Sequence, residues 1–246
     1  KQSDGDVKND SVGKVMDGVK IKIDESGEIL VKSSSMLKEY YKRPDATEES
    51  LTTDGFFKTG DAGFIDANKH LKIIDRSKDI GRLTDGTMFA PQFIENKLKF
   101  FPFIKEAVCF GDQRSKVCSF INIDMEAVGN WAERKGLAYA GYIELTGKPE
   151  VYDLVHECIK KVNTELSRDK ELANSKISRF LILHKELDPD DNELTRSRKV
   201  RRNFVAEKYG VLVEALFDGS KDCNITTAVK FEDGRILRLN SLGANL

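Results

Sequence analysis

The sequence predicts an α+β protein, in which a small antiparallel β subdomain is followed by a separate α+β domain. Short runs of alternating apolar and polar residues, separated by turn-forming residues, fill the first 75 positions. A charged run, Asp75-Arg76-Ser77-Lys78-Asp79, comes next. Beyond it, helical apolar periodicity alternates with short apolar runs. We therefore place the β subdomain at residues 1–75, a connector at 76–81 and the second domain at 82–246.

The first domain begins with the pattern of a half-buried hairpin. Val19, Ile21 and Ile23 alternate with lysines, and the turn-forming residues 24–27 lead to a second run at residues 28–32. After a polar stretch, residues 56–66 and 70–74 have the composition of two further strands. One antiparallel sheet would accommodate all of these segments.

The second domain opens with a helix and two strands. Pro91 suits the first turn of a helix, and Ile94 and Leu98 recur one turn apart on its expected buried face. We expect Glu95, on the same helix, to be structural. Strands are predicted at residues 107–110 and 117–124. Between these strands and the next long helix, Trp131 has helical spacing from Met125 and Val128, which predicts a core position.

The clearest helix covers residues 150–168, where one face carries Val151, Leu154, Val155, Cys158, Ile159, Val162 and Leu166. A strand at residues 177–184 and a helix at residues 200–209 follow. We expect Gly210 to end that helix in a left-handed cap. The chain then closes with a hairpin of strands 226–231 and 235–239 around Asp233-Gly234.

Composition excludes several functional classes. Forty basic and 41 acidic residues give a net charge of -1, so the positive field typical of nucleic-acid-binding proteins is absent. Four scattered cysteines predict neither a zinc site nor a disulfide framework, namely Cys109, Cys118, Cys158 and Cys223. The three histidines share no metal-ligating spacing, and we expect each at the surface or in a strand: His70, His156 and His184.

Nothing at the start of the sequence resembles a signal peptide, and no apolar run reaches the roughly 20 residues that span a bilayer. We therefore expect a cytoplasmic protein without a transmembrane segment. Peripheral membrane contact stays open, although no strongly amphipathic basic helix supports it. The sequence does not indicate an oligomeric state.

Seven short segments carry a family resemblance, and they occur in a fixed order. They are Gly27-Glu28-Ile29-Leu30-Val31, Tyr40-Tyr41, Asp54 to Asp61 with its Thr59-Gly60-Asp61 end, Ile74-Asp75-Arg76-Ser77-Lys78-Asp79, Gly86 to Pro91, Ile94-Glu95-Asn96, and Glu193-Leu194-Thr195-Arg196-Ser197-Arg198-Lys199-Val200. In this order and spacing they resemble the core motifs of the adenylate-forming superfamily, in the form seen in long-chain fatty-acyl-CoA synthetases. The resemblance covers about residues 12–209 and leaves 211–246 without a role. It implies that the second domain is mobile.

The resemblance assigns nucleotide contacts to two residues and a hinge to a third. An aspartate on a tight turn can accept hydrogen bonds from both hydroxyls of a ribose, and Asp61 takes that role. Arg76 would contact the ribose or a phosphate, and Lys78 would absorb the backbone rotation of the hinge. Without the resemblance, Asp61 would be read as a turn residue and the charged run as a solvated linker.

The resemblance assigns catalysis to Lys199 and acceptor binding to the loop at Gly86. An ammonium can offset the negative charge that develops when a carboxylate displaces pyrophosphate from ATP. The Gly86 loop would line the channel for the pantetheine thiol of CoA. Many members have glycine directly before the lysine, where this chain has Arg198. Without the resemblance, Lys199 would belong to an exposed basic face and Gly86 to an ordinary turn.

These assignments predict the C-terminal part of an enzyme that uses ATP, fatty acid and CoA. The expected reaction forms acyl-adenylate, and rotation at Lys78 then replaces Lys199 by the Gly86 loop for thioester formation. The family's phosphate loop, adenine-site segment and Mg²⁺-binding glutamate cannot be identified in residues 1–17, and we expect this chain alone to be inactive. Two alternatives stay open: an adenylating ligase that loads a carrier protein or another acceptor, and a non-catalytic interaction module.

Overall fold

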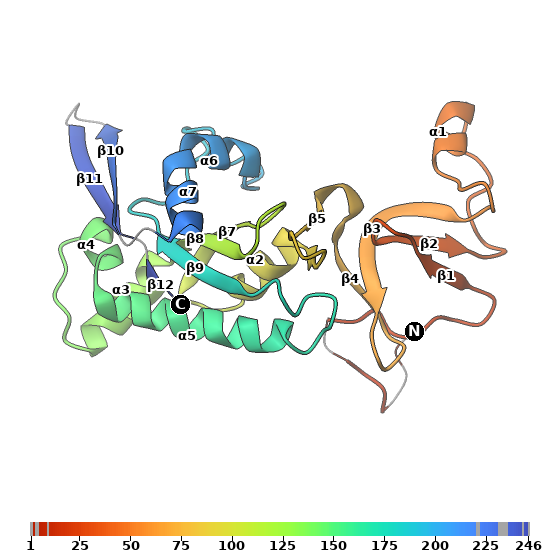
Figure 1. Cartoon of the computed structure of the whole chain (residues 1–246), viewed down its shortest axis with the longest axis horizontal. Helices are drawn as coiled ribbons and strands as arrows, with labels where there is room; N and C mark the ends of the chain where they lie inside the picture. Colours follow the sequence, from red (N-terminus) through yellow and green to blue (C-terminus); the bar gives the residue numbers. More distant parts are fainter. Residues whose placement is uncertain are drawn as a thin grey trace. The chain divides into compact units, whose positions relative to one another are not determined.

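The first apolar alternation folds into a hairpin, and the sheet it starts forms the core of the first unit in the computed structural model (Figure 1). The structure describes residues 2, 5–8, 10–219, 222–230, 236–242 and 244–245. By their contacts these residues fall into two compact units, Lys1–Ile80 and Gly81–Leu246.

The first unit is a four-stranded antiparallel sheet in the order β1-β2-β3-β4. Its strands are β1 (Lys20–Ile23), β2 (Glu28–Lys32), β3 (Phe57–Ile65) and β4 (Leu71–Arg76). The predicted hairpin is confirmed, with Ile23 opposite Ile29. The polar stretch before β3 contains a short helix that the sequence pattern did not predict, α1 (Pro44–Glu49).

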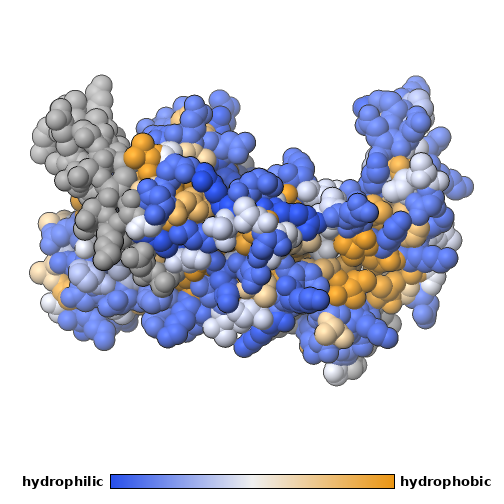
Figure 2. All heavy atoms as spheres, in the orientation of Figure 1, coloured by the Kyte–Doolittle hydropathy of each residue, from blue (hydrophilic) through white to orange (hydrophobic). Residues whose placement is uncertain are grey.

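Strand β4 reaches further than residues 70–74, because Asp75 and Arg76 continue its pairing with β3. The one-turn 3-10 helix η1 (Ser77–Asp79) follows, immediately before the division between the units. On the sheet itself, Ile65 and Ile73 are partly exposed. Figure 2 shows apolar surface gathered over this part of the first unit.

The second unit is built on a four-stranded sheet in the order β12-β9-β8-β7. The strands are β7 (Ile104–Phe110), β8 (Val117–Ile123), β9 (Ile177–Ile182) and β12 (Ala244–Asn245), and a two-stranded hairpin, β5 (Gly81–Arg82) with β6 (Met88–Phe89), precedes them. Only the β8 to β9 pair is parallel within this sheet. Parallel neighbours need a crossover connection, which here contains α3 (Met125–Arg134), α4 (Tyr142–Thr146) and α5 (Pro149–Leu166).

Every residue of β8 is buried, which requires cover on both faces of the sheet. Phe120 and Cys118 pack against α6 (Arg202–Lys208) and α7 (Gly210–Asp218). On the other face lies α5, as Figure 1 shows, and α2 (Pro91–Lys99) contacts both β7 and α5. The predicted apolar stripe of α5 is confirmed, and its Leu154 is partly exposed.

The expectations for the glycine cap and for two of the histidines need correction. Gly210 does not cap α6, because it has no left-handed φ and opens α7; the left-handed cap is Gly219, with φ 85°. His70 and His184 are buried, at 0% and 7% exposure, and neither lies within a strand. His70 is held by hydrogen bonds to Ser11 and Asp6, which fasten the N-terminal segment to the turn before β4.

The C-terminal hairpin is confirmed as strands β10 (Asp222–Lys230) and β11 (Ile236–Leu242), which pair antiparallel. Its expected turn at Asp233-Gly234 lies outside the described residues. Trp131, expected in the core, is only half-buried on α3, whereas Val128 is fully buried. None of the helices in the described residues combines the length and the apolar composition that a membrane span requires.

Candidate functional site

The structure places Asp61 and Arg76 opposite each other on β3 and β4. Asp61 Oδ1 lies 2.8 Å from Arg76 Nη1, and both side chains are accessible, with 33% and 62% of their surface exposed. An accessible carboxylate beside a guanidinium presents hydrogen-bond acceptors and donors together, which suits a ligand with both hydroxyls and phosphate. The two residues that the sequence motifs single out thus form one pair on the first unit.

A bulge in β3 presents Asp61. Between two register pairs, Leu30 with Lys58 and Glu28 with Ala62, β3 contains two more residues than β2. Gly60 adopts φ 71°, which favours glycine, and its N–H donates to Glu28 Oε1 at 2.8 Å. The Thr59-Gly60-Asp61 motif is therefore a bulge, where the local strand twist re-aims a side chain.

Gly86 lies in the turn between β5 and β6 of the second unit. Its φ is 84°, and a Cβ added there would meet no atom within 4 Å, so the glycine is required by conformation. Asp85 accepts hydrogen bonds from Thr87 N at 2.9 Å and from Asn174 Nδ2 at 2.8 Å. Hydrogen bonds from the Thr87 backbone and hydroxyl, and then from Asn174, hold the pKa of Asp85 below its ordinary value. This turn is thus fastened to the segment before β9.

Lys199 lies in a tight turn between β9 and α6, and its side chain is exposed. Thr195 N donates to Lys199 O at 2.8 Å, and Lys199 N donates to Thr195 Oγ1 at 3.0 Å. Arg198, where many adenylate-forming enzymes have glycine, adopts φ 58°. This left-handed conformation is the one that glycine adopts without steric cost.

Lys78 is the middle residue of η1, two residues before the division between the units. The structure thus brings Asp61 and Arg76 into contact in the first unit, and it places Gly86 and Lys199 in two separate turns of the second. Among the described residues, no cluster of three or more histidine, cysteine, aspartate or glutamate side chains could hold a metal ion.

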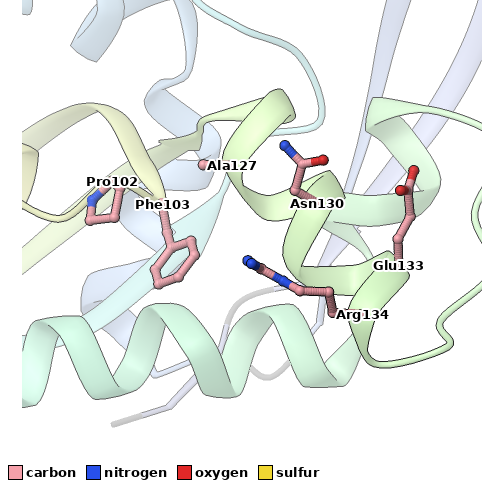
Figure 3. A pocket seen from close by; sticks show the side chains of 6 residues that line it. All are labelled: Pro102, Phe103, Ala127, Asn130, Glu133 and Arg134. Atoms are coloured by element: carbon pink, nitrogen blue, oxygen red, sulfur yellow. The ribbon is translucent and has the colours of Figure 1, made fainter.

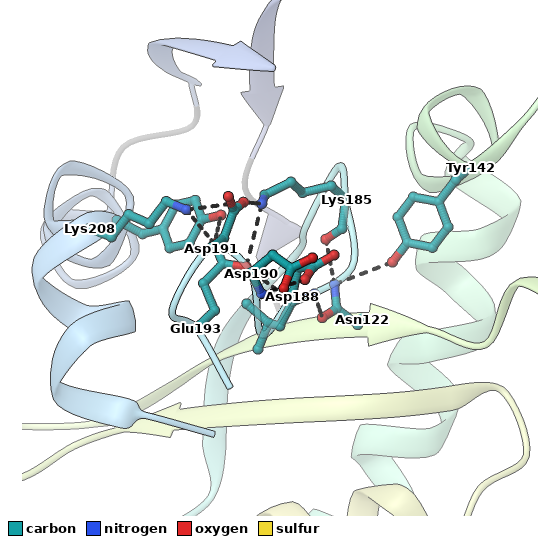
Figure 4. A network of polar contacts seen from close by, with 10 residues as sticks. Asn122, Tyr142, Lys185, Asp188, Asp190, Asp191, Glu193 and Lys208 are labelled. Atoms are coloured by element: carbon teal, nitrogen blue, oxygen red, sulfur yellow. Dashed lines mark hydrogen bonds and ion pairs between the residues drawn. The ribbon is translucent and has the colours of Figure 1, made fainter. Parts of the chain in front are cut away.

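The sequence did not predict the contacts that Arg202 and Glu193 make near the lysine turn. Arg202, grouped with the basic run, pairs with Glu95 on α2, a residue that is 5% exposed. Glu193 is completely buried and accepts hydrogen bonds from Lys208, Tyr209 and Lys185 (Figure 4). A glutamate inside an apolar helical stripe, such as Glu95 between Ile94 and Leu98, was the available signal for the Arg202 contact.

The charges around Glu193 influence one another. Burial and then the hydrogen bond to Glu193 raise the pKa of Tyr209 far above its ordinary value. Burial, the largest single influence, would lower the pKa of Lys208, but the hydrogen bonds and charges of Glu193 and Asp191 together outweigh it, and the net shift is upward. The Lys185 side chain holds the pKa of Asp191 below its ordinary value. The network therefore favours a charged Lys208 and a protonated Tyr209 beside the buried carboxylate.

A shallow cavity of about 600 Å³ lies elsewhere on the second unit (Figure 3). Its lining residues come from the segment before β7 and from α3: Pro102, Phe103, Ala127, Asn130, Glu133 and Arg134. None of the residues that the sequence motifs single out lines it, so it belongs to a different part of the surface.

Comparison with known proteins gives a consistent set of matches. A model of the family described as AMP-binding enzyme C-terminal domain matches residues 78–221. Long-chain-fatty-acid–CoA ligase FadD15 of Mycobacterium tuberculosis is 34% identical over 214 residues, which is 87% of this chain and 35% of that protein. Peroxisomal long chain acyl-CoA synthetase 7 of Arabidopsis thaliana is 30% identical over 178 residues, 72% of this chain and 25% of that protein.

Among solved structures, the A domain of carboxylic acid reductase from Segniliparus rugosus matches 78% of this chain with 28% of its own. The TM-score is 0.52 and the sequence identity 25%. The chain spans about a third of the length of the curated relatives it matches.

Proposed function

The chain belongs to the family of AMP-binding enzyme C-terminal domains. We propose that it is the C-terminal part of an ATP-dependent fatty-acyl-CoA synthetase. Two relatives above are a long-chain-fatty-acid–CoA ligase and a long chain acyl-CoA synthetase. The matching reductase domain was solved in complex with AMP and a co-purified carboxylic acid. A nucleotide and a carboxylic acid are the reactants that the first half-reaction requires.

One observation carries the proposal: Asp61 Oδ1 and Arg76 Nη1 lie 2.8 Å apart, and both side chains are accessible to solvent. A carboxylate accepts hydrogen bonds from two vicinal hydroxyls, and a guanidinium donates to phosphate or hydroxyl oxygens. We assign these two side chains to the ribose and phosphate of the adenylate.

In the proposed first step, a carboxylate oxygen of the fatty acid attacks the α-phosphorus of ATP, and pyrophosphate leaves. The charge that develops on both groups would be offset by the Lys199 ammonium. In the second step, the thiol of CoA attacks the acyl carbonyl and AMP leaves. We assign the binding of the approaching thiol to the Gly86 turn. Backbone rotation at Lys78 would replace the Lys199 turn by the Gly86 turn between the two steps.

The test uses a full-length ligase that contains this chain. Lys199→Ala should lower the rate of ATP-pyrophosphate exchange by at least 100-fold, since an oriented charge at the transition state contributes a factor of about 10²–10³. Thioester formation from supplied acyl-adenylate should change by less than threefold. Asp61→Asn should instead weaken binding of both ATP and acyl-adenylate.

Lys170→Ala, an exposed lysine outside the motifs, is the matched control and should leave both half-reactions unchanged. Equal loss of both half-reactions in Lys199→Ala would contradict the assignment of Lys199 to adenylation. Product analysis with free CoA separates a CoA ligase from a ligase that loads another acceptor.

A further inference from the structure

The turn that carries Lys199 needs support from outside itself. Leu194 and Val200 form an isolated bridge at its base, and two hydrogen bonds between Thr195 and Lys199 close it. Arg198 lies in the left-handed region, with φ 58°, a conformation that is strained for any residue other than glycine. Because the turn is short, exposed and strained, its local bonds alone do not fix the position of Lys199.

The first arm of the turn is held by Glu193, directly before Leu194. This residue is completely buried, yet its carboxylate is surrounded by donors (Figure 4). The donors are Tyr209 Oη at 2.6 Å, Lys208 Nζ at 2.8 Å, Asp188 N at 2.9 Å and Lys185 Nζ at 3.4 Å. A carboxylate offers about four acceptor positions, so this one is saturated.

The second arm of the turn, which contains Arg201, is hydrogen-bonded to the residues of the first arm. Arg201 N donates to Glu193 O at 2.9 Å, and Arg201 Nη1 donates to Asn192 O at 3.2 Å. The next residue, Arg202, donates to the Glu95 carboxylate and to Cys109 O at 2.9 Å. Both arms are therefore tied to buried groups, and the Lys199 side chain projects from an otherwise anchored turn.

The donors to Glu193 are themselves fixed by the core. Tyr209 is 2% exposed and packs edge-on against Phe120 of β8, with 5.9 Å between ring centroids. Asn122, also on β8, donates to Lys185 O at 2.8 Å and accepts from Leu187 N at 3.0 Å. An unbroken set of contacts thus runs from the central strand through Glu193 to the turn.

From this arrangement we propose that Glu193 is a positioning residue for Lys199, which it holds at the reacting groups by anchoring the turn to Tyr209, Lys208 and Lys185. The proposal rests on the proposed function, in which Lys199 acts in adenylation. Desolvation offsets much of the attraction between buried charges, so a network of this kind adds little net stability. A displacement of about 1 Å at a reacting group costs about 100-fold in rate, so anchoring matters to the chemistry.

The first experiment measures the turn without measuring activity. In Glu193→Gln of this chain, hydrogen exchange at the amides of Thr195 and Lys199 should accelerate at least tenfold, while β8 amides keep their protection. Glu186→Gln is the matched control, because that carboxylate pairs with Lys105 at the surface. Unchanged exchange in the turn, or equal acceleration in β8, would overturn the proposal.

The second experiment uses the full-length ligase. Glu193→Gln should lower kcat for adenylation by 10- to 100-fold with KM for ATP within twofold, and it should leave the thioester half-reaction within threefold. Tyr209→Phe removes one of the four donors and should cause a smaller fall, which keeps the test informative if Glu193→Gln does not fold. A KM increase with kcat unchanged would overturn the positioning role.

Lys199→Ala in the same assay separates this proposal from the proposed function. If Lys199→Ala leaves adenylation unchanged, the role of Lys199 fails, and the positioning proposal fails with it. If Lys199→Ala abolishes adenylation while Glu193→Gln and Tyr209→Phe leave kcat unchanged, the proposed function stands and the positioning role of Glu193 is wrong.

Discussion

Replacement of Arg202 by methionine should destabilise the second unit by about 3–5 kcal/mol, which is the usual cost of leaving one partner of a buried pair uncompensated. Methionine keeps much of the apolar stem but removes the donors to both Glu95 oxygens and to Cys109 O. The Glu95 carboxylate, 5% exposed, would keep Cys109 N as its neighbouring donor.

The cost should depend on pH. Burial already raises the pKa of Glu95 despite the opposing Arg202 guanidinium, and loss of that guanidinium raises it further. A raised carboxyl pKa makes the folded state relatively more stable below the ordinary value of 4.5 and less stable as pH rises through the folded value. The destabilisation should therefore be larger at pH 7 than at pH 4.5.

Urea denaturation followed by tryptophan fluorescence measures this directly. Trp131 is the single tryptophan of the chain and lies on α3, so its signal reports the second unit. With a slope of about 1–3 kcal/mol per molar urea, the transition midpoint should fall by more than about 1 M.

Two further variants decide the interpretation. Arg114→Met breaks the exposed pair with Glu214 and should cost less than about 1 kcal/mol. Glu95→Leu combined with Arg202→Met replaces both charges and should recover most of the stability lost in the single variant. If Arg202→Met costs no more than Arg114→Met, or if the double variant is no more stable than Arg202→Met, the reasoning is refuted.

Two other predictions concern stability. Arg198→Gly should stabilise the second unit by about 0.5–1 kcal/mol, since glycine adopts φ 58° without a steric cost, while Arg198→Val should destabilise the same unit. Thermal unfolding of both variants measures these changes, and a valine variant more stable than the parent chain would contradict the prediction. Burial, and then the neighbouring Lys185, lower the pKa of His184 below 6.5, so stability should fall as pH drops below 6.5, by up to about 1.4 kcal/mol per pH unit. His184→Leu should remove that slope, whereas the control His156→Gln should keep it; an unchanged slope in His184→Leu would exclude this residue as its source.

Periodicity was sufficient for the main elements of both units. The α5 stripe from Val151 to Leu166 and the alternation around Ile21 and Ile23 each follow one local repeat, and one local repeat specifies one face to bury. The same approach missed α1 and α4, which have six and five residues, because so short a segment contains too few turns to establish a period. It also assigned the left-handed cap to Gly210, which in fact opens α7. The glycine with the left-handed conformation is Gly219, directly after α7.

The sequence by itself determined the family, through motifs whose order and spacing are read along the chain, and it identified Asp61, Arg76, Lys78, Gly86 and Lys199 as candidates. Only the tertiary structure decided that Asp61 and Arg76 meet across two strands, and that Glu193 and Arg202 anchor the lysine turn. The physical reason is separation: Arg202 and Glu95 lie 107 residues apart, and a charge in a basic run looks the same in the sequence whether it faces water or a buried carboxylate.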